Sequence, residues 1–374
     1  MIVCGGGPAG IGAALAAARN GAKTRLIEVN GCLGGVWTAG LLSWLFEMDQ
    51  PGATREITRE LDQRGARRNI CSHSTDKYAY DVEAMKLLLE ELLTSAGVEF
   101  HLHSRVVAAT RTGARLRSLI TESQSGREAW TAHTFIDASG DGDLSALAGC
   151  GYDLGKPETG ALQPFTFMAL VTAAKIEELR PFIVFTDGFA HSGFVEPTRR
   201  FCEEIQRAGV DPSYHASTLF HLRDNLCALM INHEYDVSPL NERDVTKATV
   251  RGRAEVHRVI EALRALGGPW RELLLSPRRN KSAPAKVAAS TGATRSLPMI
   301  CASARAIRMR SAGSATGSTY IPPTPRKAGD LRRNHSRPST TTSPIALSSR
   351  ATATTCSWRG AASAAIFYHT QATA

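Results

Sequence analysis

The most chemically specific residues of this sequence are glycines near its N-terminus, where a short apolar strand at residues 2–4 breaks into a turn. Three of them have the spacing GxGxxG, and an Ala-rich stretch typical of a helix follows. The first glycine permits the tight turn, the second lets a pyrophosphate approach the backbone, and the third lets helix and strand pack closely. The helix N-terminus adds N–H groups for the phosphates. The pattern predicts a dinucleotide-binding turn made of Gly5, Gly7, Pro8, Ala9 and Gly10.

An acidic residue stands where such a site needs one. A second strand is predicted at residues 24–27, and it ends at Glu28, 18 residues beyond Gly10. A carboxylate at this place accepts hydrogen bonds from the hydroxyls of an adenosine ribose and disfavours a 2′-phosphate. The alternative is that the glycines only make a packed turn. The strand, the helix and the acid together favour the nucleotide site.

Two further stretches favour FAD over NAD. A second glycine loop, residues 31–35, directly follows the acid and suits a cofactor whose far half extends past the pyrophosphate. Residues 134–143 have the pattern of a buried strand that breaks into a Gly/Asp turn, and such a strand end can return beside the first turn. The candidate contacts in these two stretches are Gly34, Gly35, Gly140 and Asp141.

Together these motifs resemble the bacterial FAD-dependent oxidoreductases of the FAD-oxidored type, which are related to the flavin subunit of heterodisulfide reductase. The resemblance rests on GGGPAG, the acid, GCLGG, YDVEAMK and DASGDGDLSALAG, and it covers residues 1–275. It implies an FAD cofactor, a small-molecule substrate and a backbone contact of Val106 with the adenine. Iron–sulfur clusters occur in relatives, but the eight cysteines here are scattered without a CxxC pair, so no cluster or metal is expected.

The expected fold class is α/β. A Rossmann-like FAD-binding domain is predicted over residues 1–154, with an inserted or following α+β substrate domain over residues 155–276. The remaining stretch, residues 277–374, is expected to be disordered or non-native.

Periodicity predicts several elements inside these units. In the first unit, we expect a helix over 81–96, a third parallel strand over 98–103 and an antiparallel strand over 129–135. In the second unit, we expect strands over 163–171 and 225–232 and a long helix over 244–266. Trp37, Trp44 and Phe46 could face the flavin, but they are predicted to fill the core instead.

No arrangement of side chains for catalysis is recognisable. Cys32 and Cys71 lack a CxxC partner, which argues against a flavin–disulfide relay. Ser72–His73 and His191–Ser192 are adjacent in sequence, and that says little about a triad. Because the chemistry of a flavoenzyme belongs to its flavin, an enzyme is still expected while its catalytic residues stay unassigned.

The composition, with 43% hydrophobic and 21% charged residues, is that of a globular protein. No run approaches the ~18 apolar residues of a membrane span, and the N-terminus lacks the pattern of a signal peptide. We therefore expect a cytoplasmic protein with no membrane partner. The first strand is shorter than the usual ~5–6 residues, which favours a start codon upstream of Met1.

The net charge of +9 is distributed unevenly. Residues 1–276 carry 29 basic and 34 acidic residues, whereas residues 277–374 carry 15 basic residues and a single acid, Asp330. Three interpretations of this basic stretch are open. It is a disordered tail, a nucleic-acid-binding arm, or the C-terminal region of the family translated out of frame.

The genetic code tests the third interpretation. When the third base of each codon is joined to the first two of the next, residues 354–373 permit N-L-L-V-A-G-R-C-I-S-G-D-F-L-S-H-A-S-Y, which resembles the flavin-binding motif that closes proteins of this family. Residues 281–299 and 318–325 permit two further family segments in the same frame and order. We favour the frameshift, which would remove the residues that hold the isoalloxazine and leave the adenosine half of the site.

Three hypotheses for function follow. The first is an FAD-dependent oxidoreductase that transfers a hydride or electron pair between flavin and a small substrate. The second is an inactive frameshifted product, and the third is a nucleotide-binding module whose basic tail contacts nucleic acid. We rank the third lowest and do not expect nucleic acid as a partner. The substrate, the electron-transfer partner and the oligomeric state stay open.

Overall fold

The computed structural model describes residues 1–46, 51–67, 77–156, 158–184 and 194–276, together with two short strands, β14 (Ala293–Thr294) and β15 (Trp358–Arg359). These two strands pair in antiparallel fashion. Apart from them, the expectations for residues 277–374, including the frameshift, lie outside the described residues. The same holds for Cys71 and for the pairs Ser72–His73 and His191–Ser192.

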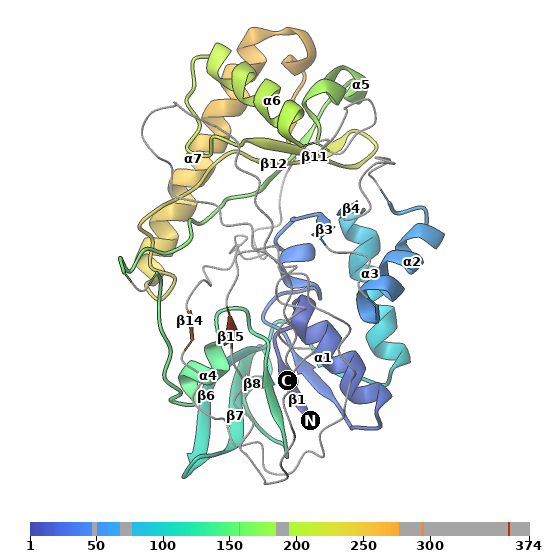
Figure 1. Ribbon diagram of the computed structural model, residues 1–374, viewed down its shortest axis with the longest axis vertical. Helices are drawn as coiled ribbons and strands as arrows, with labels where there is room; N and C mark the ends of the chain where they lie inside the picture. The colour runs from blue at the N-terminus through green and yellow to red at the C-terminus, as the bar shows by residue number, and fades with distance from the viewer. Residues whose placement is uncertain are drawn as a thin grey trace, which may run out of the picture.

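A parallel sheet of four strands, in the order β5-β2-β1-β9, lies in the lower half of the molecule in Figure 1. Residue Ile2 in the central strand pairs with Arg25 on one side and with Phe135 on the other. The return of β9 to the side of β1 is the arrangement that the sequence predicts. The strands are β1 (Ile2–Cys4), β2 (Arg25–Ile27), β5 (Glu99–His101) and β9 (Phe135–Asp137).

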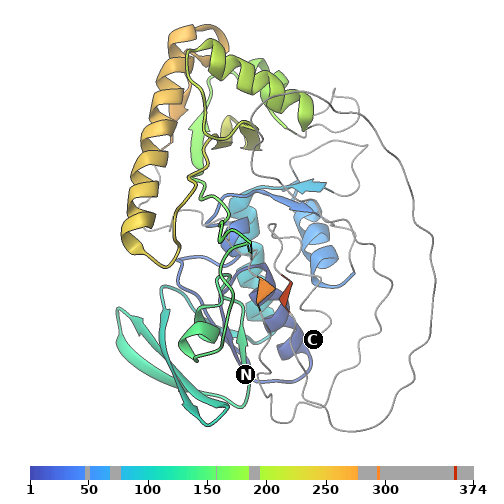
Figure 2. The same ribbon diagram turned by 60° about the vertical axis from the view of Figure 1, so that its left-hand side comes forward.

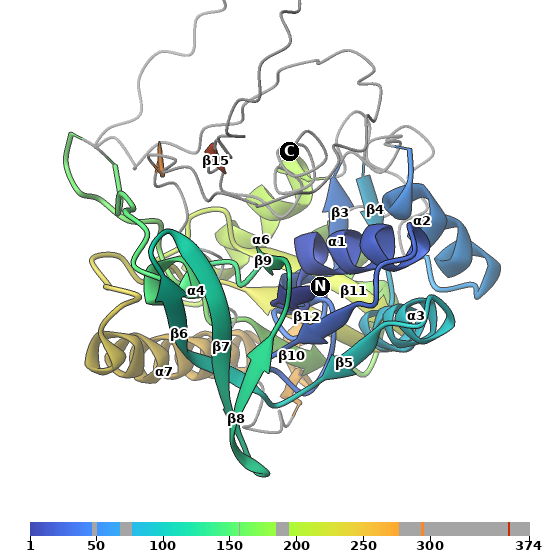
Figure 3. The same ribbon diagram turned by 90° about the horizontal axis from the view of Figure 1, so that it is seen from below.

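Different layers cover the two faces of the parallel sheet. Val3 packs toward helices α1 (Pro8–Arg19) and α3 (Val82–Ser95), whereas Ile2 and Cys4 pack with Leu119 of a three-stranded antiparallel meander. This alternation follows from the period of two in a strand. Figure 3 shows the meander beside the parallel sheet. Its strands are β6 (Arg105–Thr112), β7 (Arg115–Ser123) and β8 (Gly126–Thr131).

Local sequence explains the helix α3. The side chain of Asp81 accepts hydrogen bonds from the backbone N–H groups of Glu83 and Ala84, which caps the helix N-terminus. Met85, Leu88 and Leu89 recur on one helical face and are buried. The apolar stripe is the signal on which the prediction of this helix rested, and the Asp81 cap is found in the structure.

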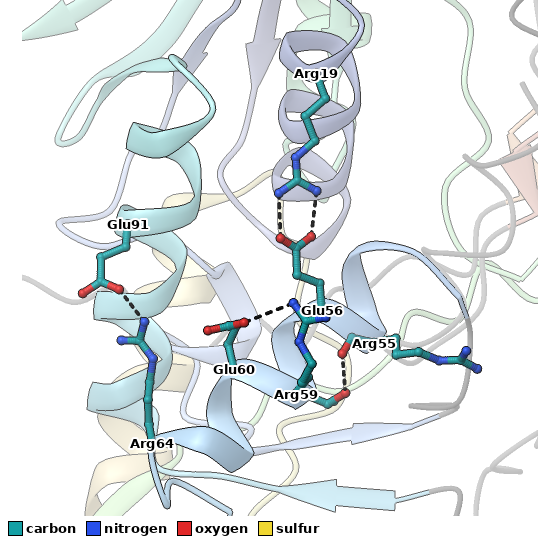
Figure 4. Close-up of polar contacts among 8 residues, drawn as sticks. Arg19, Arg55, Glu56, Arg59, Glu60, Arg64 and Glu91 are labelled. Atoms are coloured by element: carbon teal, nitrogen blue, oxygen red, sulfur yellow. Dashed lines mark hydrogen bonds and ion pairs between the residues drawn. The ribbon is translucent and has the colours of Figure 1, made fainter.

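Helix α2 (Ala53–Gln63) lies across the ends of α1 and α3 and is joined to both by ion pairs. The Arg19 guanidinium donates two hydrogen bonds of 2.7 Å to the Glu56 carboxylate, and Arg64 pairs with Glu91 of α3 (Figure 4). The buried Ile57 packs into the core. Nearby, β3 (Trp44–Phe46) and β4 (Lys77–Ala79) form an antiparallel pair.

A second antiparallel sheet, here called the distal sheet, has the order β11-β12-β10-β13. Figure 2 shows α7 running along the outside of the molecule beside this sheet. The strands are β10 (Ala169–Thr172), β11 (Thr218–Arg223), β12 (Leu226–Met230) and β13 (Leu274–Leu275). The helices are α5 (Ile176–Leu179), α6 (Val195–Arg207) and α7 (Glu242–Leu266).

The distal sheet contributes to two cores. Leu219 and Leu229 face α6 and α7, whereas Phe220 and Met230 belong to the same apolar cluster as the residues around the parallel sheet. Trp44 joins the two halves, since its ring lies 5.1 Å from that of Phe220 in an edge-on arrangement. Trp37 and Trp44 are therefore core residues, as predicted.

Two predicted strands were wrong in their extent. The strand expected over 163–171 begins only at Ala169, and before it Phe165 makes an isolated antiparallel bridge with Glu234. The strand expected over 129–135 is two elements, since the chain leaves the meander after Thr131 and enters the parallel sheet at Phe135. Within the described part of the chain, no helix is both long and apolar enough to cross a membrane.

Candidate nucleotide-binding site

The glycine turn after β1 has the geometry that its spacing predicts. Gly5 has φ +100°, and a Cβ there would clash with the carbonyl of Ala138 at the end of β9. A Cβ at Gly10 would clash with the carbonyl of Gly5. A Cβ at Gly7 would instead meet no atom within 4 Å. Two glycines thus allow close packing, and the third leaves an open approach to the backbone.

The N-terminus of α1 lies at this open approach. Gly7 is the N-cap, Pro8 begins the helix, and no side chain caps it. The first N–H groups of a helix have no partner within the helix, so an anion placed here would meet donors and the positive end of the helix dipole. Pro8, Ala9 and Gly10 are buried in the first turn, where Ile11 N donates to Gly7 O at 2.9 Å.

The predicted acid lies directly beside the turn. Glu28 is 3% exposed, and its Oε2 accepts a hydrogen bond of 2.5 Å from Gly6 N. Its Oε1 accepts from both the backbone N (2.7 Å) and the side-chain Nδ2 (2.6 Å) of Asn30. Burial raises the pKa of the Glu28 carboxyl, and the hydrogen bonds from Asn30 and Gly6 counteract part of that rise.

The second glycine loop packs against the first. Gly34 N donates to Gly6 O at 2.7 Å, and both Gly34 and Gly35 have positive φ angles, +103° and +54°. A Cβ at Gly35 would lie 2.9 Å from the Cα of Gly7. The structure thus brings together the two glycine loops that the sequence predicts as parts of one site.

Two side chains that the sequence does not single out fix the backbone in and after this loop by hydrogen bonds. The buried Tyr80 hydroxyl lies 2.9 Å from Trp37 O and 3.1 Å from Leu42 O. The Thr38 hydroxyl donates to Leu33 O. Tyr80 lies in the motif YDVEAMK, but nothing local in the sequence indicates a partner about forty residues away.

The end of β9 completes the site on the other side of β1. Asp137 accepts hydrogen bonds from the backbone and hydroxyl of both Ser139 and Ser145, at 2.6–3.2 Å. These bonds fix the turn that contains Gly140, with φ +89°, and Asp141. Ala138 N donates to Cys4 O, which places the turn against the glycine motif.

Val106 lies in the first strand of the meander, and the residue just before that strand contacts Glu28. Ser104 N donates to Glu28 O at 2.9 Å, and β6 begins at the next residue. Val106 is half-buried and pairs with Thr121 beside a bulge. The predicted site residues therefore lie in the segments that follow the carboxyl ends of β1, β2, β5 and β9.

A model of the FAD dependent oxidoreductase family matches residues 1–286. The chain belongs to this family. The match covers both sheets and ends shortly after β13. FAD is the cofactor of the family.

Several solved structures are similar to this FAD-dependent oxidoreductase family member at low identity. A THI4 protein of Thermovibrio ammonificans is 20% identical over 39% of this chain and 59% of its own, with a TM-score of 0.30. A geranylgeranyl bacteriochlorophyll reductase-like protein of Thermoplasma acidophilum is 14% identical over 74% and 64%, with a TM-score of 0.45. The p-nitrophenol 4-monooxygenase PnpA of Pseudomonas putida is 12% identical over 74% and 65%, with a TM-score of 0.42. The chain spans less than two thirds of each, and no curated protein sequence matches it.

Reactive side chains are sparse around this site. Burial raises the pKa of the half-buried Cys32 thiol, whose Sγ lies 3.7 Å from the Thr38 hydroxyl, so the thiol stays protonated at neutral pH. Among the described residues there is no group of three or more His, Cys, Asp or Glu side chains that could hold a metal ion.

Proposed function

We propose that the chain is an FAD-dependent oxidoreductase that transfers a hydride or electron pair between flavin and a small-molecule substrate. In this proposal, residues 1–154 form the FAD-binding domain and residues 155–276, with the distal sheet, form the substrate domain. The enzyme acts in the cytoplasm. Membership of the FAD dependent oxidoreductase family supports the cofactor and the class of reaction.

The observation that carries the proposal is the arrangement of the two glycine loops around Gly7. A Cβ at this residue would point into open space, while Gly35 packs on its Cα and the N-terminus of α1 begins one residue later. A pyrophosphate fits such a place, because it needs close access to backbone N–H groups and no side chain in the way. The residues present therefore fit the adenosine diphosphate half of FAD.

Each predicted residue has a role in this proposal. The glycine turn and the start of α1 hold the pyrophosphate, Glu28 accepts a ribose hydroxyl, and the backbone at Val106 meets the adenine. Bound FAD supplies an isoalloxazine ring that gains or loses two electrons. No side chain of the described residues is assigned to catalysis. The proposed cofactor contacts are Gly5, Gly7, Pro8, Ala9, Gly10, Glu28, Gly34, Gly35, Val106, Gly140 and Asp141.

We also propose that residues beyond about 277 are translated out of frame. The family match ends at residue 286 of 374, and the basic composition begins in the same region. The chain as written would then retain the adenosine half of the site and lack the residues that hold the isoalloxazine.

The test compares the chain as written with a frame-corrected gene, after resequencing the codons for residues 274–281. The corrected protein is expected to retain stoichiometric FAD and a flavin absorption spectrum, and the chain as written is expected to bind FAD more weakly. Gly7→Ala is the site variant, since φ −70° and the open space around Gly7 permit a methyl group. It should keep the melting temperature and lose FAD. A colourless corrected protein contradicts the proposal.

A further inference from the structure

The Glu28 carboxylate is already largely occupied by donors of its own chain. A carboxylate offers about four acceptor positions, two on each oxygen. Both positions on Oε1 are taken by Asn30, through its backbone N and its side-chain Nδ2, and one on Oε2 is taken by Gly6 N. A hydrogen bond from the backbone of Val29 also lowers the pKa of this carboxyl, so little acceptor capacity is left. A ribose that presents two hydroxyls to this carboxylate therefore needs at least one of these donors to leave.

Two of these donors are fixed by the fold. Gly34 N donates to Gly6 O at 2.7 Å and holds the peptide on one side of the glycine turn. His103 N donates to Asn30 O at 3.1 Å and holds the loop after β2. Neither backbone N–H can withdraw without breaking the packing of the two glycine loops.

The Asn30 side-chain amide, unlike these backbone donors, is able to move. Asn30 is half-buried at the surface of the loop, so its side chain can rotate into solvent. In its present position it satisfies a carboxylate that is 3% exposed, and an unsatisfied carboxylate would be strongly unfavourable there. The amide thus donates to Glu28 the kind of hydrogen bond that a ribose hydroxyl would donate.

We propose that the Asn30 side chain is a built-in occupant of the ribose subsite, which stabilises the nucleotide-free protein and must be displaced when the adenosine ribose binds. The inference rests on the proposed function, because it requires the nucleotide site to be real. In this inference, Asn30 weakens nucleotide binding and stabilises the protein when no nucleotide is bound. A residue that merely positions Glu28 would have the opposite effect on affinity.

Calorimetric titration of the full chain with ADP, which carries the adenosine half of the cofactor alone, tests this inference. Asn30→Ala is expected to bind ADP about three- to tenfold more tightly than the wild type, since no hydrogen bond to the charged carboxylate has to be broken first. The nucleotide-free variant is expected to melt at a lower temperature. Binding of 2′,3′-dideoxy-ADP, which has no ribose hydroxyls, is expected to be equal in both proteins.

Asn20→Ala is the matched control. Asn20 is the C-cap of α1, where its Nδ2 donates to Ala16 O at 2.8 Å, far along the helix from the glycine turn. Its removal should change stability alone and leave ADP affinity as it is. Asn30 does not have a positive φ, so alanine can adopt its backbone conformation. Asn30→Gly also lacks the amide and is a second variant with the same expected gain.

Equal or weaker ADP binding by the Asn30 variants, with the wild type binding ADP normally, overturns the inference and leaves the proposed function standing. A gain for the dideoxy nucleotide as large as the gain for ADP also overturns it, because the effect would then not pass through the hydroxyls. Failure of the wild type and of both variants to bind ADP overturns the proposed nucleotide site and this inference with it.

Discussion

A single phenolic hydroxyl ties the stretch after the second glycine loop to the rest of the molecule. Tyr80 is 0% exposed, and its hydroxyl bridges Trp37 O and Leu42 O. We expect Tyr80→Phe to lower the free energy of unfolding by about 1–2 kcal/mol, because buried carbonyls lose their donor. Chemical denaturation measures this. Tyr152→Phe is the control, since Tyr152 is 52% exposed, and equal loss in both variants contradicts the assignment.

A half-buried histidine shortly after β12 makes stability depend on pH. Burial lowers the pKa of His233 to about 4, and its ring stacks on Tyr214 at 3.9 Å. The unfolded chain takes up a proton near pH 6.5 that the folded protein takes up only near pH 4. Stability is therefore lost as the pH falls through this window, by at most ~1.4 kcal/mol per pH unit.

His233→Phe, which retains a ring for the stack, is expected to remove this part of the pH dependence. Urea denaturation at pH 7, 6 and 5 gives the free energy of unfolding of both proteins, and the slopes of this free energy against pH are compared. Tyr235→Phe is the control, because it removes the hydroxyl 3.3 Å from His233 Nδ1 and leaves the imidazole. An equal dependence of the unfolding free energy on pH in the wild type and in His233→Phe would show that the imidazole does not cause it.

At the scale of the element, α2 shows which contact holds a helix in place. Its outer ion pair joins Glu56 to Arg19 (Figure 4), and both side chains are partly exposed. Its inner face buries Ile57 at 0% exposure. We expect Ile57→Ala to reduce the free energy of unfolding by about 2–5 kcal/mol through a core cavity.

The paired variant Glu56→Gln is expected to reduce the free energy of unfolding by less than about 1 kcal/mol, since solvent screens the ion pair. Both values come from denaturation curves followed by tryptophan fluorescence. A larger loss in Glu56→Gln than in Ile57→Ala would mean that the ion pair, and not the apolar contact, positions the helix.

The elements that could be predicted from the sequence are those whose signals are local. The turn at Gly5–Gly10, the acid that ends β2, α3 with its Asp81 cap, and α7 each carry their signal within a few residues. The contacts of Tyr80 and the role of Asn30 could not be predicted in this way. They depend on where loops meet in space, and a strand such as β10 starts where its partner β12 begins to pair with it.

At the scale of the whole molecule, the parallel sheet and the distal sheet share one apolar core. Phe220 and Met230 of the distal sheet lie in the same cluster as Val3 and Leu15 around the parallel sheet, and Trp44 packs between them. If the two parts bury apolar area against one another in this way, neither can unfold without exposing the other. The described residues are therefore expected to unfold in one cooperative transition.

A double-mutant cycle of Trp44→Leu and Phe220→Leu measures the link directly. Their rings lie 5.1 Å apart at 70°, an edge-on geometry for which a coupling energy of about 0.5–1.5 kcal/mol is expected. Phe182 and Trp270, 4.9 Å apart within the distal core, give a comparison pair that does not span the two sheets. Coupling between Phe182 and Trp270 without coupling between Trp44 and Phe220 would mean that the sheets are stable separately. Coupling in both pairs, with a second transition appearing only when Trp44 and Phe220 are replaced, would identify this contact as the one that makes the fold a single cooperative unit.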